Sequence, residues 1–134
     1  MSLYVDSSAL LKRYVDEPDS DLVEELLRSD PDLITARHTV IEIRRNLARL
    51  LADRELSRIR AAFDDDLAAF ALVELDATTC ESAAAIAEVT GVRTLDALHL
   101  AAAQRVGGTA IPFCTFDVRQ AQAARSLGFS VIGA

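Results

Sequence analysis

The sequence predicts an α/β fold in which helices cover both faces of a mainly parallel sheet. Short apolar segments alternate along the chain with longer amphipathic segments, and no internal repeat or linker interrupts this alternation. Strands that alternate with helices are typical of a parallel sheet, because each parallel connection needs a crossover. A length of 134 residues is that of one domain, so residues 1–134 are predicted to form a single domain.

The elements follow in order from periodicity and from helix-start and helix-stop signals. Residues 3–5 are predicted to form the first strand, and the next helix is expected to have Ser7 or Ser8 as its N-cap and to end near Pro18. Gly91 separates two alanine-rich helices. The other predicted elements are helices over 19–28, 43–51, 55–71, 78–90, 94–106 and 118–127, and strands over 32–35, 72–75, 110–116 and 129–132.

Composition excludes several classes of protein. Hydrophobic residues make up 51% of the chain, with three prolines and five glycines, which excludes disordered and collagen-like chains. The start of the chain lacks the basic and apolar regions of a signal peptide, and no apolar run is long enough to span a membrane. We therefore expect a cytoplasmic protein without a membrane partner. The net charge of −7 argues, taken alone, against a nucleic-acid partner.

The charge is distributed unevenly. Residues 16–32 carry eight acids and one base, whereas residues 35–60 carry seven arginines and three acids. A cationic surface on an acidic body is one interpretation, and a solvated helix face with internal ion pairs is the other. If the first holds, Arg44, Arg45 and Arg49 are the candidates to hold a nucleic-acid backbone.

Two aspartates follow predicted strands, at the carboxyl ends where a parallel sheet places its ligands, and a third lies at the start of a helix. Asp6 directly follows the first predicted strand, and Asp117 follows the strand predicted over 110–116. Asp96 lies in the first turn of an alanine-rich helix. Each residue alone is explained by helix capping or by the helix dipole, so only their convergence points to a site.

Glu42 is harder to explain by local structure. It is flanked by Ile41 and Ile43, and it lies beside the apolar stripe of its helix rather than opposite it. A partly buried acid needs an arginine, a backbone N–H or a metal ion as partner. Four acids at one edge repel one another unless protons or cations neutralise them, and an all-oxygen site suits Mg²⁺ or Mn²⁺.

These positions carry a family resemblance. The chain resembles PIN-domain ribonucleases, in particular the VapC-type toxins of toxin–antitoxin pairs. The resemblance implies a three-layer α/β/α sandwich of about four to five mainly parallel strands, and a metal-dependent endoribonuclease. The matching segments are residues 4–10, 41–45, 94–103, 115–117 and 128–131.

The resemblance also implies roles and partners. Asp6 and Asp96 would be the main metal ligands, Asp117 would complete the metal shell, and Glu42 would bind the metal or a coordinated water. Thr115 and Ser7 would be accessory hydroxyls, although ordinary capping explains both. The resemblance further implies a Mg²⁺ or Mn²⁺ cofactor and an RNA substrate. It also implies a small VapB-like antitoxin as partner and a homodimer of the toxin.

Three alternatives differ in what they require. A response-regulator-like module needs a lysine after a late strand, but the single lysine is Lys12. A haloacid-dehalogenase-type phosphatase needs a second aspartate where Ser8 stands. The remaining alternative is a catalytically inactive PIN-like module that binds RNA or protein. His38 and His99 are lone histidines without a second catalytic partner. His99 stands one turn after Asp96 and could orient it, but a core or surface histidine with satisfied hydrogen bonds is the favoured interpretation.

Overall fold

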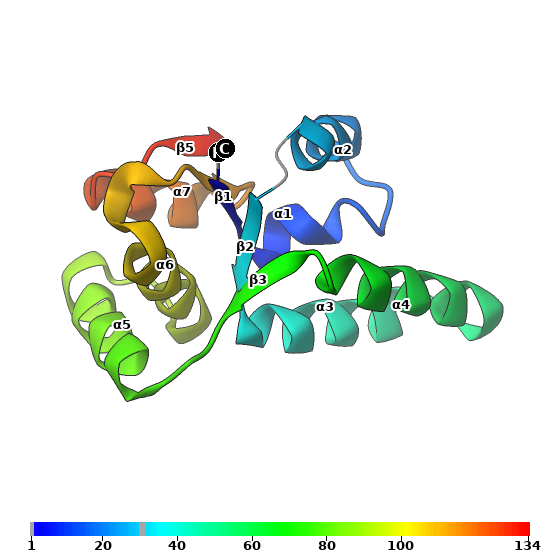
Figure 1. Ribbon diagram of the computed structural model, residues 1–134, viewed down its shortest axis with the longest axis horizontal. Coiled ribbons are helices and arrows are strands. Elements are labelled where there is room, and N and C mark those ends of the chain that lie inside the picture. The colour runs from blue at the N-terminus through cyan, green and yellow to red at the C-terminus, as the bar shows by residue number, and fades with distance from the viewer. Residues whose placement is uncertain (1, 30–31) are drawn as a thin grey trace.

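The computed structural model describes residues 2–29 and 32–134 and contains one five-stranded sheet in which every pairing is parallel. The strand order is β3-β2-β1-β4-β5, so β1 lies at the centre (Figure 1). This confirms the predicted α/β class and its mainly parallel sheet. The strands are β1 (Ser2–Val5), β2 (Asp32–Ala36), β3 (Phe70–Val73), β4 (Phe113–Thr115) and β5 (Val131–Gly133).

Helices cover both faces of this sheet, which gives the three layers of an α/β/α sandwich (Figure 1). α1 to α4 lie on one side, where α3 and α4 run side by side away from the sheet, and α5 to α7 lie on the other. None of the helices among the described residues is long and apolar enough to cross a membrane. The helices are α1 (Ser7–Leu11), α2 (Ser20–Ser29), α3 (Arg37–Leu50), α4 (Asp53–Leu67), α5 (Ala77–Thr90), α6 (Thr94–Gly107) and α7 (Val118–Ser126), with a short 3₁₀ turn at Gly108–Ala110.

Successive side chains of β1 point alternately into two hydrophobic cores, one on each face of the sheet. Leu3 and Val5 point into the core under α1 to α4, while Tyr4 points into the core under α5 to α7. All three side chains are almost fully buried, as expected for a central parallel strand covered on both faces. Alanines on α6 and α7 allow those helices to pack closely on the sheet.

Several element boundaries differ from the predicted ones. The first helix ends at Leu11 rather than near Pro18, and its N-cap is Asp6, whose side chain accepts a hydrogen bond from the backbone N–H of Ala9. β3 ends two residues earlier than predicted, at Val73, because its register with β2 ends at Ala36. β4 is shorter than predicted, and β5 is displaced by one or two residues toward the carboxyl end. The parallel register, rather than local hydrophobicity, sets these limits.

Candidate active site

The carboxyl ends of β1, β2 and β4 and the start of α6 place four acids at one edge of the sheet. Asp6 follows β1 directly and is almost fully buried, with 3% of its surface exposed. Glu42 lies in the second turn of α3, which continues from β2. Asp117 caps α7 after β4, and Asp96 lies in the first turn of α6.

Electrostatic coupling shows that these acids lie near one another. Burial raises the pKa of Asp96, and the negative charges of Asp117, Asp6 and Glu42 raise it further, although His99 opposes them. Burial also raises the pKa of Asp6, against the opposing effects of His99, Thr115 and Ser8. The arrangement therefore holds negative charge that the protein only partly compensates.

The carboxylates differ in how much of their bonding capacity is used. Asp6 Oδ1 accepts from Ser8 Oγ at 2.7 Å and from the N–H of Ala9 at 3.0 Å. Asp117 Oδ1 accepts from the N–H of Gln120 at 2.9 Å. The Asp96 carboxylate makes no hydrogen bond or ion pair with any described residue. Oxygen atoms therefore remain free on three separate elements, and free carboxylate oxygens are the ligands that Mg²⁺ and Mn²⁺ prefer.

Glu42 is held by partners that the sequence analysis did not identify. Its Oε1 accepts from Ser7 Oγ at 2.8 Å and lies 3.0 Å from His99 Nε2 and 3.6 Å from His38 Nε2. Burial acts to raise the pKa of Glu42, but the hydrogen bonds from His99 and Ser7 outweigh it and hold the pKa below its usual value. Glu42 is therefore an anion fixed in one orientation.

His99 connects this carboxylate to the central strand. Because a carboxylate only accepts, Nε2 of His99 is the donor, and in the neutral ring Nδ1 accepts from Tyr4 Oη at 2.7 Å. Both His99 and Tyr4 are buried. His99 is thus the buried, hydrogen-bonded histidine that the sequence favours, and its carboxylate partner is Glu42 rather than Asp96.

His38 completes a second group of possible metal ligands. His38, Glu42 and His99 each offer one atom, and these atoms all lie within 4.8 Å of one another. However, His38 Nε2 donates to the carbonyl oxygen of Leu95 at 3.1 Å, and His99 Nε2 donates to Glu42. A metal ion at this group would have to displace both hydrogen bonds, so the group fits an ion less well than the free aspartate oxygens.

The two predicted accessory hydroxyls have different surroundings. Ser7 Oγ donates to Glu42, whereas Thr115 Oγ1 accepts from the N–H of Asp117 at 3.2 Å and thus shapes the turn before α7. The hydroxyl oxygens of Ser8 and Thr115 lie 3.3 Å apart. The Ser8 hydroxyl also donates to Asp6, and this role of Ser8 was not predicted from the sequence. Gln120, fully buried, donates to the carbonyl of Asp96 and so ties α7 to α6.

The three arginines predicted to bind RNA all lie on α3 and are exposed. Arg44 and Arg45 make no side-chain hydrogen bond or ion pair with the described residues, while Arg49 donates to Asn46 Oδ1. At about 100° per residue, Arg45 and Arg49 lie within about 60° of Glu42 around the helix, whereas Arg44 lies about 160° away. Arg45 and Arg49 thus share the side of α3 on which Glu42 lies.

Comparison with solved structures shows the same fold in toxin–antitoxin proteins. The structure aligns with FitAcB from Neisseria gonorrhoeae at a TM-score of 0.76 and 21% identity, covering 99% of this chain and 97% of that one. It aligns with Mycobacterium tuberculosis VapC20, described as a sarcin-ricin loop cleaving toxin, at a TM-score of 0.78 and 18% identity, covering 98% and 99%.

Sequence comparison shows the family. The chain is 36% identical over 131 residues to Ribonuclease VapC46 of Mycobacterium tuberculosis, covering 98% of this chain and 96% of that protein. It is 32% identical over 134 residues to Ribonuclease VapC35 of the same species, covering 97% and 95%. The model of the PIN domain family matches residues 3–126. With this match, and with VapC ribonucleases similar over nearly its whole length, the chain belongs to the PIN domain family and to the VapC group within it.

Proposed function

We propose that this chain is the toxin of a toxin–antitoxin pair, a Mg²⁺- or Mn²⁺-dependent endoribonuclease that hydrolyses RNA phosphodiester bonds. The single observation that carries this proposal is the placement of Asp6, Glu42, Asp96 and Asp117, from four different elements, at the carboxyl edge of the sheet. Relatives named ribonucleases and structural neighbours described as toxin–antitoxin complexes support the same assignment.

The donor set fits a divalent cation. Asp6 and Asp96 would hold the ion, Asp117 would complete its shell, and Glu42 would bind the ion or a water next to it. When bound, such an ion activates the attacking water and stabilises the charge that develops on the phosphodiester. The low pKa of Glu42 keeps this residue anionic, so it can orient a water by accepting a hydrogen bond.

Other residues position the four acids or are proposed to bind the RNA. Ser7 and His99 orient Glu42, Ser8 orients Asp6, and Gln120 fixes the approach of α7 to α6. Arg45 and Arg49 are proposed to contact RNA phosphates beside the site, with Arg44 contributing less. A VapB-like antitoxin as partner and a homodimer of the toxin belong to the same proposal.

The alternative is a PIN-like module that binds RNA or protein without cutting. All four acids are present and share one edge, and none of them is neutralised by a described arginine or lysine within ion-pair distance. A binding module has no need for such a costly arrangement of like charges. The alternative therefore has less support than the enzyme.

The Asp6→Asn substitution is expected to stabilise the fold while removing a metal ligand. Asparagine retains the cap of α1 but removes the buried charge, so in EDTA the melting temperature should rise by about 3–5 °C, equivalent to about 1 kcal/mol. Mn²⁺ should raise the melting temperature of the unsubstituted protein more than that of Asp6→Asn, because the ion binds only the folded state. Asp65→Asn, at an exposed acid of α4, is the matched control. If Mn²⁺ does not change the melting temperature of the unsubstituted protein, the metal assignment is contradicted.

The Asp96→Asn substitution is expected to slow RNA cleavage at least about 100-fold, because it removes a carboxylate that has no other partner. Cleavage of a total RNA preparation in Mg²⁺, followed by mapping of 5′-phosphate ends, measures this loss. Asp65→Asn should cleave at the parental rate. If Asp96→Asn cuts as fast as the parent, the activity belongs to another site, and RNA binding without any cutting would favour the inactive module.

The arginines of α3 are expected to act by phosphate contact. Arg45→Ala should weaken binding of single-stranded RNA and reduce the slope of log affinity against log salt by about 0.7, the value for one phosphate contact. Arg44→Ala, with the same change in charge on another side of the helix, should have a smaller effect. Fluorescence anisotropy across a range of KCl concentrations checks both. Equal effects of the two substitutions would show that the side of the helix is irrelevant and would remove these residues from the site.

A further inference from the structure

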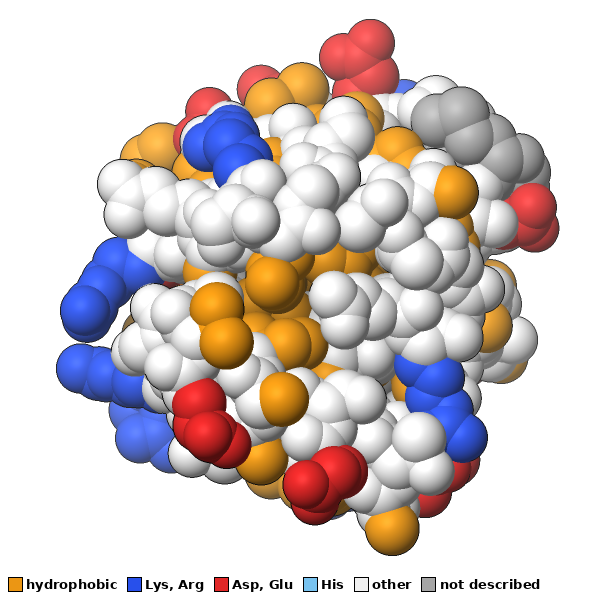
Figure 2. All heavy atoms as spheres, turned by 90° about the vertical axis from the view of Figure 1, so that its left-hand side faces the viewer, with side chains coloured by type: hydrophobic (Ala, Val, Ile, Leu, Met, Phe, Trp, Pro, Cys, Tyr) orange, Lys and Arg blue, Asp and Glu red, His pale blue; other side chains and the backbone are white. Residues whose placement is uncertain are grey.

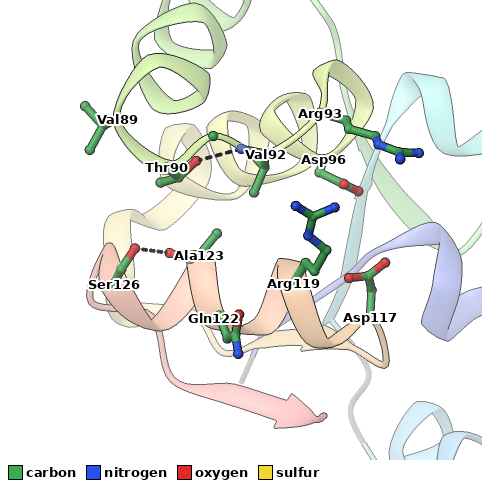
Figure 3. Close-up of a pocket in the computed structure, with 11 residues that line it drawn as sticks. Val89, Thr90, Val92, Arg93, Asp96, Asp117, Arg119, Gln122, Ala123 and Ser126 are labelled. Carbon is green, nitrogen blue, oxygen red and sulfur yellow. Dashed lines mark hydrogen bonds between the residues drawn. The ribbon is translucent and has the colours of Figure 1, made fainter.

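A pocket of about 600 Å³ adjoins two of the four acids and lies between the turn that joins α5 to α6 and helix α7 (Figure 3). Asp96 and Asp117 line its charged end, and Val92 and Ala123 line its apolar part. This volume lies within the range of pockets that hold small ligands. An RNA strand with a phosphodiester at the acids has this pocket directly beside the bond to be cut.

Two arginines line the same pocket without intramolecular partners. Figure 3 shows Arg119 extending from α7 toward Asp96, with Arg93 on the other side of Asp96. Neither side chain makes a hydrogen bond or ion pair with any described residue. By contrast, Arg37 pairs with Glu74 and Arg105 pairs with Asp76. Both guanidinium groups of the pocket are therefore available to an anion.

The rest of the lining offers apolar surface and one free amide. Thr90 Oγ1 donates to the carbonyl of Ile86 and accepts from the N–H of Val92, and Ser126 Oγ donates to the carbonyl of Ala123, so both hydroxyls are already used. The side-chain amide of Gln122 has no partner among the described residues. Figure 2, which faces α5 to α7, shows a hollow floored by hydrophobic side chains on this side of the molecule. Apolar walls beside a free amide match an unstacked nucleobase.

We propose that this pocket is the nucleotide subsite next to the scissile bond, where Arg119 holds the neighbouring phosphate and Val92 and Ala123 contact an unstacked base. Gln122 then hydrogen-bonds the edge of that base and contributes sequence preference. This assignment rests on the proposed ribonuclease function and adds to it a place for the substrate.

RNA fits this combination of charges better than a peptide does. Guanidinium groups bind phosphate oxygens in a planar, bidentate manner, and the next phosphate of an RNA strand follows the one at the acids. A basic peptide is attracted by Asp96 and Asp117 but repelled by Arg93 and Arg119. In the proposed function a divalent cation neutralises the acids, which leaves the arginines for a phosphate and the apolar lining for a base.

The test compares arginine substitutions on one helix. In the Asp6→Asn background, Arg119→Ala should weaken binding of a fluorescein-labelled, mixed-sequence single-stranded RNA about tenfold and lower the salt slope by about 0.7. Arg125→Ala, on the same helix and with the same charge change, should leave binding within about twofold of the background, because Arg125 donates to the carbonyl of Ala134 outside the pocket. In the otherwise unsubstituted chain, Gln122→Ala should change which nucleotide flanks the cut.

The outcomes separate this subsite from the proposed function. If Arg119→Ala binds RNA as tightly as the background, or if Arg125→Ala weakens binding equally, the subsite is overturned and a peptide becomes the favoured occupant. If the unsubstituted chain cuts no RNA, the proposed function fails, while the binding comparison still decides whether the pocket holds a nucleotide. Equal thermal melting of the variants shows that neither loss reflects unfolding.

Discussion

The burial of Asp6 at the end of the central strand is the constraint on which the rest of the site depends. The side chain is 3% exposed and its pKa is raised by burial, so the protein holds a carboxyl group where its charged form is disfavoured. The capping bond from Ala9 and the hydroxyl of Ser8 fix its position without neutralising it. Because β1 lies between β2 and β4, Asp6 lies at the end of the strand flanked by those that precede Glu42 and Asp117.

The histidines show how the protein limits the repulsion at this edge. His99 lies between Tyr4 and Glu42, so that one acid receives a hydrogen bond while Asp6 and Asp96 keep free oxygens. Burial lowers the pKa of the neighbouring His38 to about 4, and that ring is therefore neutral near pH 7. Glu42 thus has a different environment from the aspartates, which fits a role in orienting water rather than in holding the ion alone.

Much of this arrangement could be predicted from sequence, because it depends on local patterns. Asp6 and Asp117 follow strands, and Asp96 opens a helix, so their place at the carboxyl edge follows from the parallel topology. The limits of β3 and β5 could not be predicted, because they depend on register with strands distant in sequence. The same reason applies to His99, whose contacts with Glu42 and Tyr4 span 57 and 95 residues. The pocket between α6 and α7 is likewise a product of packing.

The distribution of arginines explains how an acidic chain can act on a polyanion. Net charge is −7, but several arginines are paired within the molecule, and those without a partner among residues 2–29 and 32–134 lie on the α3–α4 pair and at the pocket. Free arginines beside uncompensated acids make one edge of the sheet chemically unlike the rest of the surface. Net charge therefore describes the whole molecule and is a poor guide to this edge.

The most direct test of the central claim is a crystal structure of the protein soaked in Mn²⁺, with the anomalous signal used to locate the ion. The account predicts a Mn²⁺ peak coordinated by carboxylate oxygens of Asp6 and Asp96, with Asp117 in the same shell. A peak centred between His38 and His99, or no peak at this edge of the sheet, would contradict it.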